Sequence, residues 1–172
     1  MTPEMAEYCR TMLLVGFRDP FDAAFDQALE LEEPLSDLVL SLSTCVSDDN
    51  QVLSILREYT LQHPFDEQVV YQLVIEDIRK RFEVGNMTRS DVCLLLQLVI
   101  AQRETFFVEP WHSFTPIFYD LEMWEDGILT EEVFNQCFDA WWYHGEQLNG
   151  WELQRQQNVK PKKRGIFGFL KK

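Results

Sequence analysis

Apolar residues recur three and four positions apart along most of this chain, which is the period of a helix with one buried face. The first clear stripe follows Asp19-Pro20 and consists of Phe21, Ala24, Phe25, Ala28 and Leu29. Proline is tolerated in the first turn of a helix, and an acidic residue is favoured there. The pattern therefore predicts a helix that begins at this dipeptide.

Two further helices follow in the next thirty or so residues. Pro34 is expected to open one of them, and Asp48 or Asp49 to cap the other. Their apolar stripes are Leu35, Leu38, Val39 and Leu42 in the first, and Val52, Ile55, Leu56 and Tyr59 in the second. His63-Pro64 should end the second, because the residue before a proline avoids the helical region.

Helical spacing continues to the end of the apolar part of the chain. Pro64 begins a long segment that Gly85-Asn86 should end in a left-handed turn. Thr88 and Asp91 form a variant of the capping box ahead of residues 92–101. A weaker segment spans residues 111–124 with Pro116 inside it, and a strong helix follows Thr130, with Val133, Phe134, Cys137, Phe138 and Trp141 facing inward.

Strand signals are few, since alternation of apolar and polar residues never outlasts about four positions. We therefore expect an all-α fold of six to eight helices, which could stack as successive antiparallel hairpins. A single acidic helical domain is expected over residues 1–157. Residues 158–172 turn to Lys, Pro, Gly and Phe and are expected to form a flexible basic tail.

Size and apolar content fit a soluble cytoplasmic protein. At 172 residues with 46% apolar residues, the chain can bury one proper core. Its longest apolar run, 92–101, is too short to cross a bilayer, and the acidic amino terminus does not resemble a secretory leader. The four cysteines are widely spaced in apolar stretches, which predicts buried, reduced thiols.

Charge is sorted along the chain. All 29 acidic residues lie at or before Glu152, whereas six of the 15 cations lie in the last 13 residues. The remaining nine cations against 29 acids give residues 1–157 a net charge of −20. A surface this negative repels nucleic acid and favours a basic protein partner.

No arrangement of residues suggests an enzyme, a cofactor or a metal site. The three histidines, His63, His112 and His144, lack ligands or catalytic partners at useful spacing. The segment 122–133 resembles a calcium loop, with Gly127 in the sixth position. However, the third and twelfth positions are Trp124 and Val133, which cannot supply the required oxygen ligands. We therefore expect no catalysis, no cofactor and no bound metal.

A row of carboxylates lies opposite the first apolar stripe. Asp22, Asp26 and Glu30 are four residues apart, and no lysine or arginine lies within that helix. Like charges at this spacing cost about 0.2–0.5 kcal/mol per pair. The row is interpreted either as a docking strip for a cationic surface or as a well-solvated face.

A second cluster combines acids with aromatic rings. Twelve of the 23 aromatic residues lie between Phe106 and Tyr143, interleaved with carboxylates. The candidate partner-binding residues in this cluster are Glu122, Trp124, Glu125, Asp126, Glu131, Glu132, Trp142 and Tyr143. Exposed Trp and Tyr anchor protein partners and carboxylates select them. The alternative is that the rings only close the end of the core.

The basic tail has several possible roles. Its cations flank a small apolar group, Ile166 to Leu170, so the tail could contact anionic lipid. It could also be a nuclear address, fold back on the acidic body, or only improve solubility.

Two resemblances bear on function. The stretch Phe118-Tyr-Asp-Leu-Glu-Met-Trp-Glu-Asp-Gly-Ile-Leu-Thr-Glu-Glu-Val-Phe134 resembles the first acidic/aromatic box in the carboxy-terminal helical-repeat domain of eukaryotic translation initiation factors. That resemblance implies an all-helical adaptor that binds basic segments of partner factors.

The general character of the chain, small, very acidic, helical and rich in aromatics, resembles the immunity proteins of bacterial toxin systems. This resemblance implies a protein that masks a basic toxin. The leading hypothesis is a non-catalytic acidic protein that docks on a basic partner, as an immunity protein does. The alternative is a helical-repeat adaptor or scaffold in a larger assembly.

Overall fold

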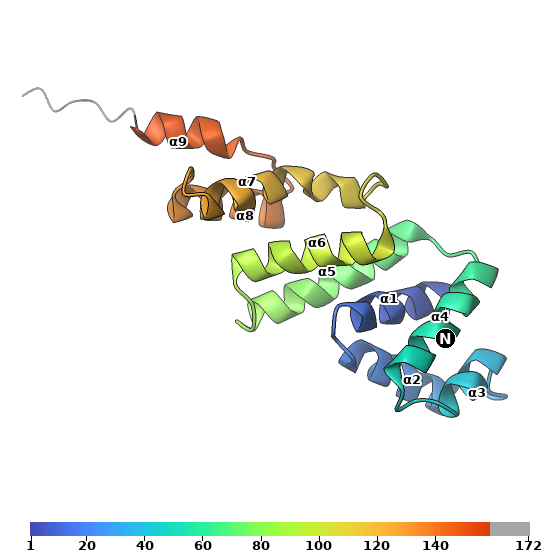
Figure 1. The fold of residues 1–172 in the computed structure, drawn as a ribbon. Coiled ribbons are helices and arrows are strands. Elements are labelled where there is room, and N and C mark those ends of the chain that lie inside the picture. Colours follow the sequence, from blue (N-terminus) through green and yellow to red (C-terminus); the bar gives the residue numbers. More distant parts are fainter. Residues whose placement is uncertain (159–172) are drawn as a thin grey trace, which may run out of the picture. The chain divides into compact units, whose positions relative to one another are not determined.

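The protein is all-helical, as the sequence predicts. A computed structural model describes residues 1–158, which contain nine α-helices, one 3-10 helix and no strand (Figure 1). The helices are thus slightly more numerous than expected. The chain divides into two compact units, residues 1–114 and a second unit that starts at Thr115. The single domain expected over residues 1–157 stays a prediction.

The first unit contains six α-helices and the 3-10 helix η1. They are α1 (Pro3–Leu14), α2 (Asp19–Leu31), α3 (Asp37–Ser43), α4 (Asp49–Gln62), α5 (Glu67–Glu83), α6 (Arg89–Arg103) and η1 (Trp111–Phe114). The predicted start of α2 is confirmed, with Arg18 rather than an acid at the cap. Helices α3 and α5 begin three residues after the expected prolines, because Ser36 and Asp66 cap them.

Helix α1 is the centre of this unit. It packs against α2, α4, α5 and α6 and buries Ala6, Cys9 and Met12 completely. Thr2 caps it, since the side-chain oxygen accepts a hydrogen bond from the Met5 N–H at 3.2 Å. No helix was predicted at Pro3–Leu14, so the prediction lacked the helix that packs against most of the others in this unit.

Helices α5 and α6 lie side by side and run in opposite directions (Figure 1). The predicted capping box of α6 is confirmed: the Thr88 N–H donates to Asp91 at 2.7 Å and the Asp91 N–H donates to Thr88 Oγ1 at 3.2 Å. This pair is an antiparallel hairpin of the expected kind. The C-terminal end of α6 is closed by Glu104, which has a left-handed conformation with φ 56°.

A buried ionic cluster joins α1, α5, α6 and η1. Arg103 donates to Glu67 at 2.6 and 3.1 Å and to Glu7 at 3.1 Å. Arg10 donates two hydrogen bonds of 2.7 Å to the carboxylate of the same Glu7. The indole N–H of Trp111 donates to Glu67, and the Arg103 guanidinium lies 5.0 Å from the centre of the Trp111 ring. Two cations and two carboxylates therefore balance one another inside the unit.

The second unit consists of α7 (Thr115–Glu125), α8 (Glu131–His144) and α9 (Gly150–Asn158). Helix α8 packs against both of the others. Its inward face carries Val133, Phe134, Cys137 and Phe138, as predicted, and each of them is buried, whereas Trp141, also expected to face inward, is half-buried. The sequence analysis did not include α9.

Helix α9 begins directly over a buried carboxylate. Asp120 of α7 accepts hydrogen bonds from the Gly150 N–H and from the Cys137 thiol. A side-chain carbon added at Gly150 would lie only 2.5 Å from an Asp120 oxygen, so glycine is needed for this approach. One turn further on, Gln154 Oε1 accepts from the Thr130 N–H at 2.9 Å. Two buried polar contacts thus attach α9 to the rest of its unit.

Other expectations concern the cysteines, the tail and membranes. All four cysteines lie within the described residues and are buried thiols, as predicted. The flexible tail was expected over residues 158–172; Asn158 is instead the last residue of α9, and residues 159–172 lie outside the described part of the chain. Within residues 1–158 no helix is long and apolar enough to span a membrane.

Candidate protein-binding surfaces

The turn between α7 and α8 brings five predicted carboxylates to one end of the second unit. Helix α7 ends at Glu125, and Gly127 takes a left-handed conformation with φ 71° that reverses the chain. Thr130 then caps α8 by accepting a hydrogen bond from the Val133 N–H. The carboxylates on this turn and its flanking helix ends are all exposed: Glu122, Glu125, Asp126, Glu131 and Glu132. We call these five residues the acidic turn.

Nothing in the described chain neutralises the acidic turn. Among residues 1–158, none of its five carboxylates forms an ion pair, and residues 115–158 contain nine acids but only one cation, Arg155. Glu131 and Glu132 lie in the first turn of α8, where the helix dipole favours negative charge. Glu122 and Glu125 lie in the last turn of α7, where it does not. The arrangement favours an incoming cation.

The aromatic part of the prediction is confirmed only in part. Tyr143 is exposed, with 53% of its surface accessible. Trp124 is half-buried and stacks on Phe134, with ring centres 5.0 Å apart. Trp142 is only 5% exposed and stacks on Phe138, so the expectation that it lies on the surface was wrong. It follows Phe134 and Phe138 at intervals of four, which places all three rings on the inward row of α8.

The outward row of α8 continues the acidic turn along the helix. Glu131, Glu132 and Asp139 line a shallow open hollow together with two amides, Asn135 and Gln136. The two amides were not among the predicted residues. Their spacing of three and four from Glu132 and Asp139 is the signal that could have identified them. A partner docked here would find hydrogen-bonding groups beside the carboxylates.

The row of acids on α2 is present but weaker than predicted. Asp26 and Glu30 are exposed, and within residues 1–158 neither carboxylate has an ion pair. Asp22 is half-buried and pairs with Arg18, whose Nε lies 3.1 Å from the Asp22 carboxylate. Arg18 lies just before the first residue of α2, so the absence of lysine and arginine within the helix does not reveal this ion pair. The strip is thus reduced to two free carboxylates.

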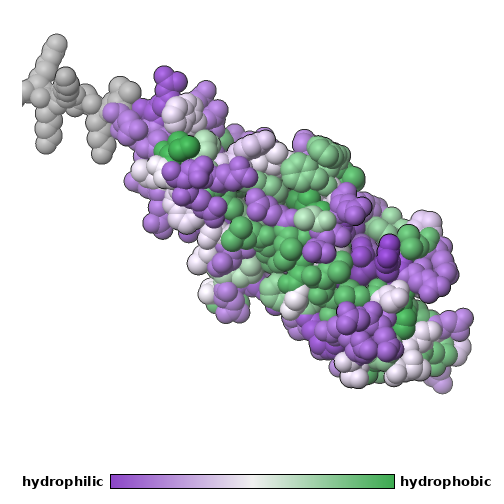
Figure 2. All heavy atoms as spheres, in the orientation of Figure 1, coloured by the Kyte–Doolittle hydropathy of each residue, from purple (hydrophilic) through white to green (hydrophobic). Residues whose placement is uncertain are grey.

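The first unit also exposes large apolar side chains that were not among the predicted residues. Leu94 and Leu98 are half-exposed on the outer side of α6, and Phe107 in the following loop is 87% exposed. Figure 2 shows hydrophobic residues gathered where α5 and α6 lie in Figure 1. Helix α6 is apolar on all sides, so its periodicity does not reveal which side faces solvent.

The one carboxylate–thiol pair in the second unit is unsuited to nucleophilic chemistry. Burial, and secondarily the nearby Asp120 carboxylate, raises the pKa of Cys137 to about 12. Burial also raises the pKa of Asp120. An activated cysteine needs the opposite shift and a cationic neighbour.

The segment that resembles a calcium loop forms the end of α7, a turn and the start of α8. Within residues 1–158 no three His, Cys, Asp or Glu side chains are grouped so as to hold a metal ion.

Comparisons of the chain with protein-family models, with curated proteins and with solved structures find no significant match. The resemblances to initiation-factor domains and to immunity proteins therefore stay predictions that rest on the sequence.

Proposed function

We propose that this protein is a non-catalytic acidic binding protein that docks on a basic protein, and that the basic protein is a toxin neutralised in the cytoplasm. The observation that carries the proposal is the acidic turn. Its five carboxylates are exposed, close in the chain, and without a cationic partner among residues 1–158. Such a concentration of charge costs stability in the free protein and is relieved by a cationic surface.

Three kinds of group on the second unit have different tasks in the proposed complex. The carboxylates raise the rate of encounter with a positive surface and orient it. Asn135 and Gln136 then offer directed hydrogen bonds from the hollow on α8. Tyr143, on the same side of α8 as Glu132, supplies an exposed aromatic ring for apolar contact.

The test begins with capture of partners at low ionic strength, identification by mass spectrometry, and elution with salt. Association of the captured basic protein is then measured with the variant Glu125→Gln, Asp126→Asn, Glu131→Gln, Glu132→Gln. We expect association to slow by about tenfold or more at low salt and to lose most of its salt dependence.

The matched control carries Glu76→Gln and Glu83→Gln on α5, which also removes exposed carboxylates. It should change the association rate much less than the variant in the acidic turn. Equal rates for the acidic-turn variant and the unmodified protein at low salt would contradict the proposal. If the captured protein degrades cell wall, membrane or nucleic acid, inhibition of that activity tests neutralisation directly.

An adaptor or scaffold in a larger assembly is the second candidate. The antiparallel pair α5 and α6, with Leu94 and Leu98 exposed on its outer side, favours this alternative. It predicts capture of several proteins together that resist elution by salt. A single basic protein that elutes with salt favours the first candidate.

A further inference from the structure

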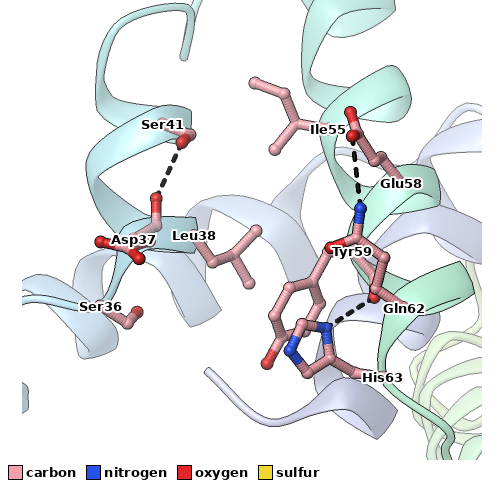
Figure 3. Close-up of a pocket in the computed structure, with 9 residues that line it drawn as sticks. All are labelled: Ser36, Asp37, Leu38, Ser41, Ile55, Glu58, Tyr59, Gln62 and His63. Carbon is pink, nitrogen blue, oxygen red and sulfur yellow. Dashed lines mark hydrogen bonds between the residues drawn. The ribbon is translucent and has the colours of Figure 1, made fainter.

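A hollow of about 520 Å³ lies between α3 and α4 of the first unit (Figure 3). Helix α3 and its cap contribute Ser36, Asp37, Leu38 and Ser41 to the lining. The last turns of α4 and its C-terminal cap contribute Ile55, Glu58, Tyr59, Gln62 and His63. Its size is within the range of pockets that hold small ligands or a large side chain.

The sequence builds this hollow from two helix ends. Ser36 ends the connection from α2 and caps α3, so that Asp37 lies in the first helical turn at the rim. Ile55, Glu58, Tyr59 and Gln62 are three or four residues apart and therefore share one side of α4. Leu38 and the Tyr59 ring point toward each other across the space (Figure 3). The hollow thus combines an apolar floor with a polar rim.

The charge around the hollow is negative. Asp37 and Glu58 are exposed, no lysine or arginine lines the space, and neither carboxylate has an ion pair among residues 1–158. Glu58 accepts only a long hydrogen bond of 3.4 Å from Gln62. Two more carboxylates, Glu32 and Glu4, are near enough to add to the rise that burial causes in the pKa of Tyr59. A cation is the complementary ligand.

One wall of the hollow is a stack of two rings. Tyr59 and His63 lie with ring centres 4.1 Å apart and planes inclined by 23°. The Nδ1–H of His63 donates to the Tyr59 carbonyl oxygen at 2.9 Å, which fixes the imidazole in this position. Flat aromatic surfaces beside carboxylates suit a guanidinium group, which stacks on rings and donates in pairs to carboxylates.

We propose that the hollow between α3 and α4 receives an arginine side chain of the basic protein partner, stacked against Tyr59 and His63 and hydrogen-bonded to Asp37 and Glu58. This inference rests on the proposed function for its partner, but it concerns a different surface, in the first unit. It assigns to the partner a specific residue type, whereas the acidic turn requires only positive charge.

The test uses N-acetyl-arginine methylamide as the probe and the full chain labelled with nitrogen-15. Titration followed by NMR should shift amide signals of the lining residues and leave those of the acidic turn in place. The lysine analogue should bind several-fold more weakly, since an ammonium cannot stack or donate in pairs as a guanidinium does. Equal binding of the two probes, or shifts spread over all acidic surfaces, would overturn the proposal.

Variants locate the interaction. Asp37→Asn with Glu58→Gln should weaken arginine binding by about tenfold, and His63→Ala should reduce the preference for arginine over lysine. Glu76→Gln with Glu83→Gln, at exposed positions on α5, is the matched control and should leave binding unchanged. Because the substituted side chains are exposed, the variants should keep the fold, and circular dichroism checks this before each titration. Unchanged binding in the Asp37/Glu58 variant would also overturn the proposal.

Two further measurements separate the possible causes of failure. The acidic-turn variant should still bind the arginine probe, so loss of partner association there tests only the proposed function. Loss of probe binding with intact, salt-dependent partner association would reject only the inference. If replacing Lys160, Lys162, Lys163 and Arg164 with Gln strengthens probe binding, the chain's own basic segment is the occupant and the assignment to a partner is wrong.

Discussion

Glu104 is the one non-glycine residue among residues 1–158 with a left-handed backbone, φ 56°, and it closes α6. Helices usually end this way on glycine, since a side chain costs roughly 1–2 kcal/mol in that conformation. Glu104→Gly should therefore raise the free energy of unfolding by about 0.5–1 kcal/mol, after the entropic cost of glycine. Urea unfolding measures the change.

Glu104→Ala is the matched comparison for that substitution. Alanine removes the carboxylate near the C-terminal end of α6 but keeps the strained backbone, so it should give little of the gain. A glycine variant no more stable than the alanine variant would contradict the assignment of strain to this position.

Asp120 should make the stability of the second unit depend on pH. Burial raises its pKa in the folded state above the unfolded value of about 3.9. The folded state thus holds this proton more tightly, and its contribution to stability falls as pH rises from about 4 through the folded pKa. Asp120→Asn removes the contribution, so the stability difference between variant and unmodified protein should shift in favour of the variant with rising pH.

Urea unfolding at several pH values between about 4 and 7 measures that difference. Gln136→Ala, at an exposed position in the same unit, changes no titrating group and supplies the control, so its difference should hardly change with pH. A flat difference for Asp120→Asn as well would mean that the carboxylate is ionised equally easily in both states.

Trp142 illustrates what residue types alone leave open. The helical period assigns Trp142 to a row of residues along α8. Because α8 is rich in aromatic residues, the period alone does not show which of two neighbouring rows faces the core. The structure buries Trp142 because it continues the row of Phe134 and Phe138. Tyr143, one residue further on, projects outward as predicted.

At the scale of elements, the ionic cluster around Arg103 holds four helical segments of the first unit together. Its side chain is 3% exposed and that of Glu7 is 2% exposed. Arg103→Met should lower the free energy of unfolding by about 3–5 kcal/mol, because Glu67 loses both of its charged hydrogen bonds and Glu7 loses one. Thermal or urea unfolding provides the measurement.

A second variant distinguishes charge from packing in that cluster. Arg103→Met combined with Glu67→Gln removes the carboxylate left without a cation and should recover part of the loss. If the single variant stays within about 1 kcal/mol of the unmodified protein, the cluster does not hold the segments together.

Most elements were predictable because their boundaries depend on local chemistry. The caps at Asp48, Thr88 and Thr130 act within three residues of themselves, so the sequence displays them directly. Helix α1 also carries a local signal, Thr2 followed by Pro3, that the sequence analysis did not use. Helix α9 carries one too, since the Asn149 side chain accepts a hydrogen bond from the Glu152 N–H at 3.1 Å, but its attachment to Asp120 and Thr130, distant residues of its own unit, has no local signal.

At the scale of the whole molecule, the sequence shows that acidic and basic residues are separated along the chain, but it does not show which of them form ion pairs. Eight of the nine cations in residues 1–157 lie before Thr115, and Arg10, Arg18, Arg81 and Arg103 are among those that form ion pairs with acids of the same unit. Residues 115–158 keep nine acids against Arg155. The excess of acidic over basic residues therefore differs between the two units, which is why the acidic turn and the α3–α4 hollow call for separate tests.

The central place of α1 has a consequence for synthesis. Its contacts with α6, including the pair of Glu7 and Arg103, join residues 96 positions apart. A ribosome adds roughly 5–20 residues each second, so about 5–20 s pass between the two ends of that contact. For that time α1 keeps part of its apolar side open to water, and nascent-chain chaperones have a defined interval in which to bind it.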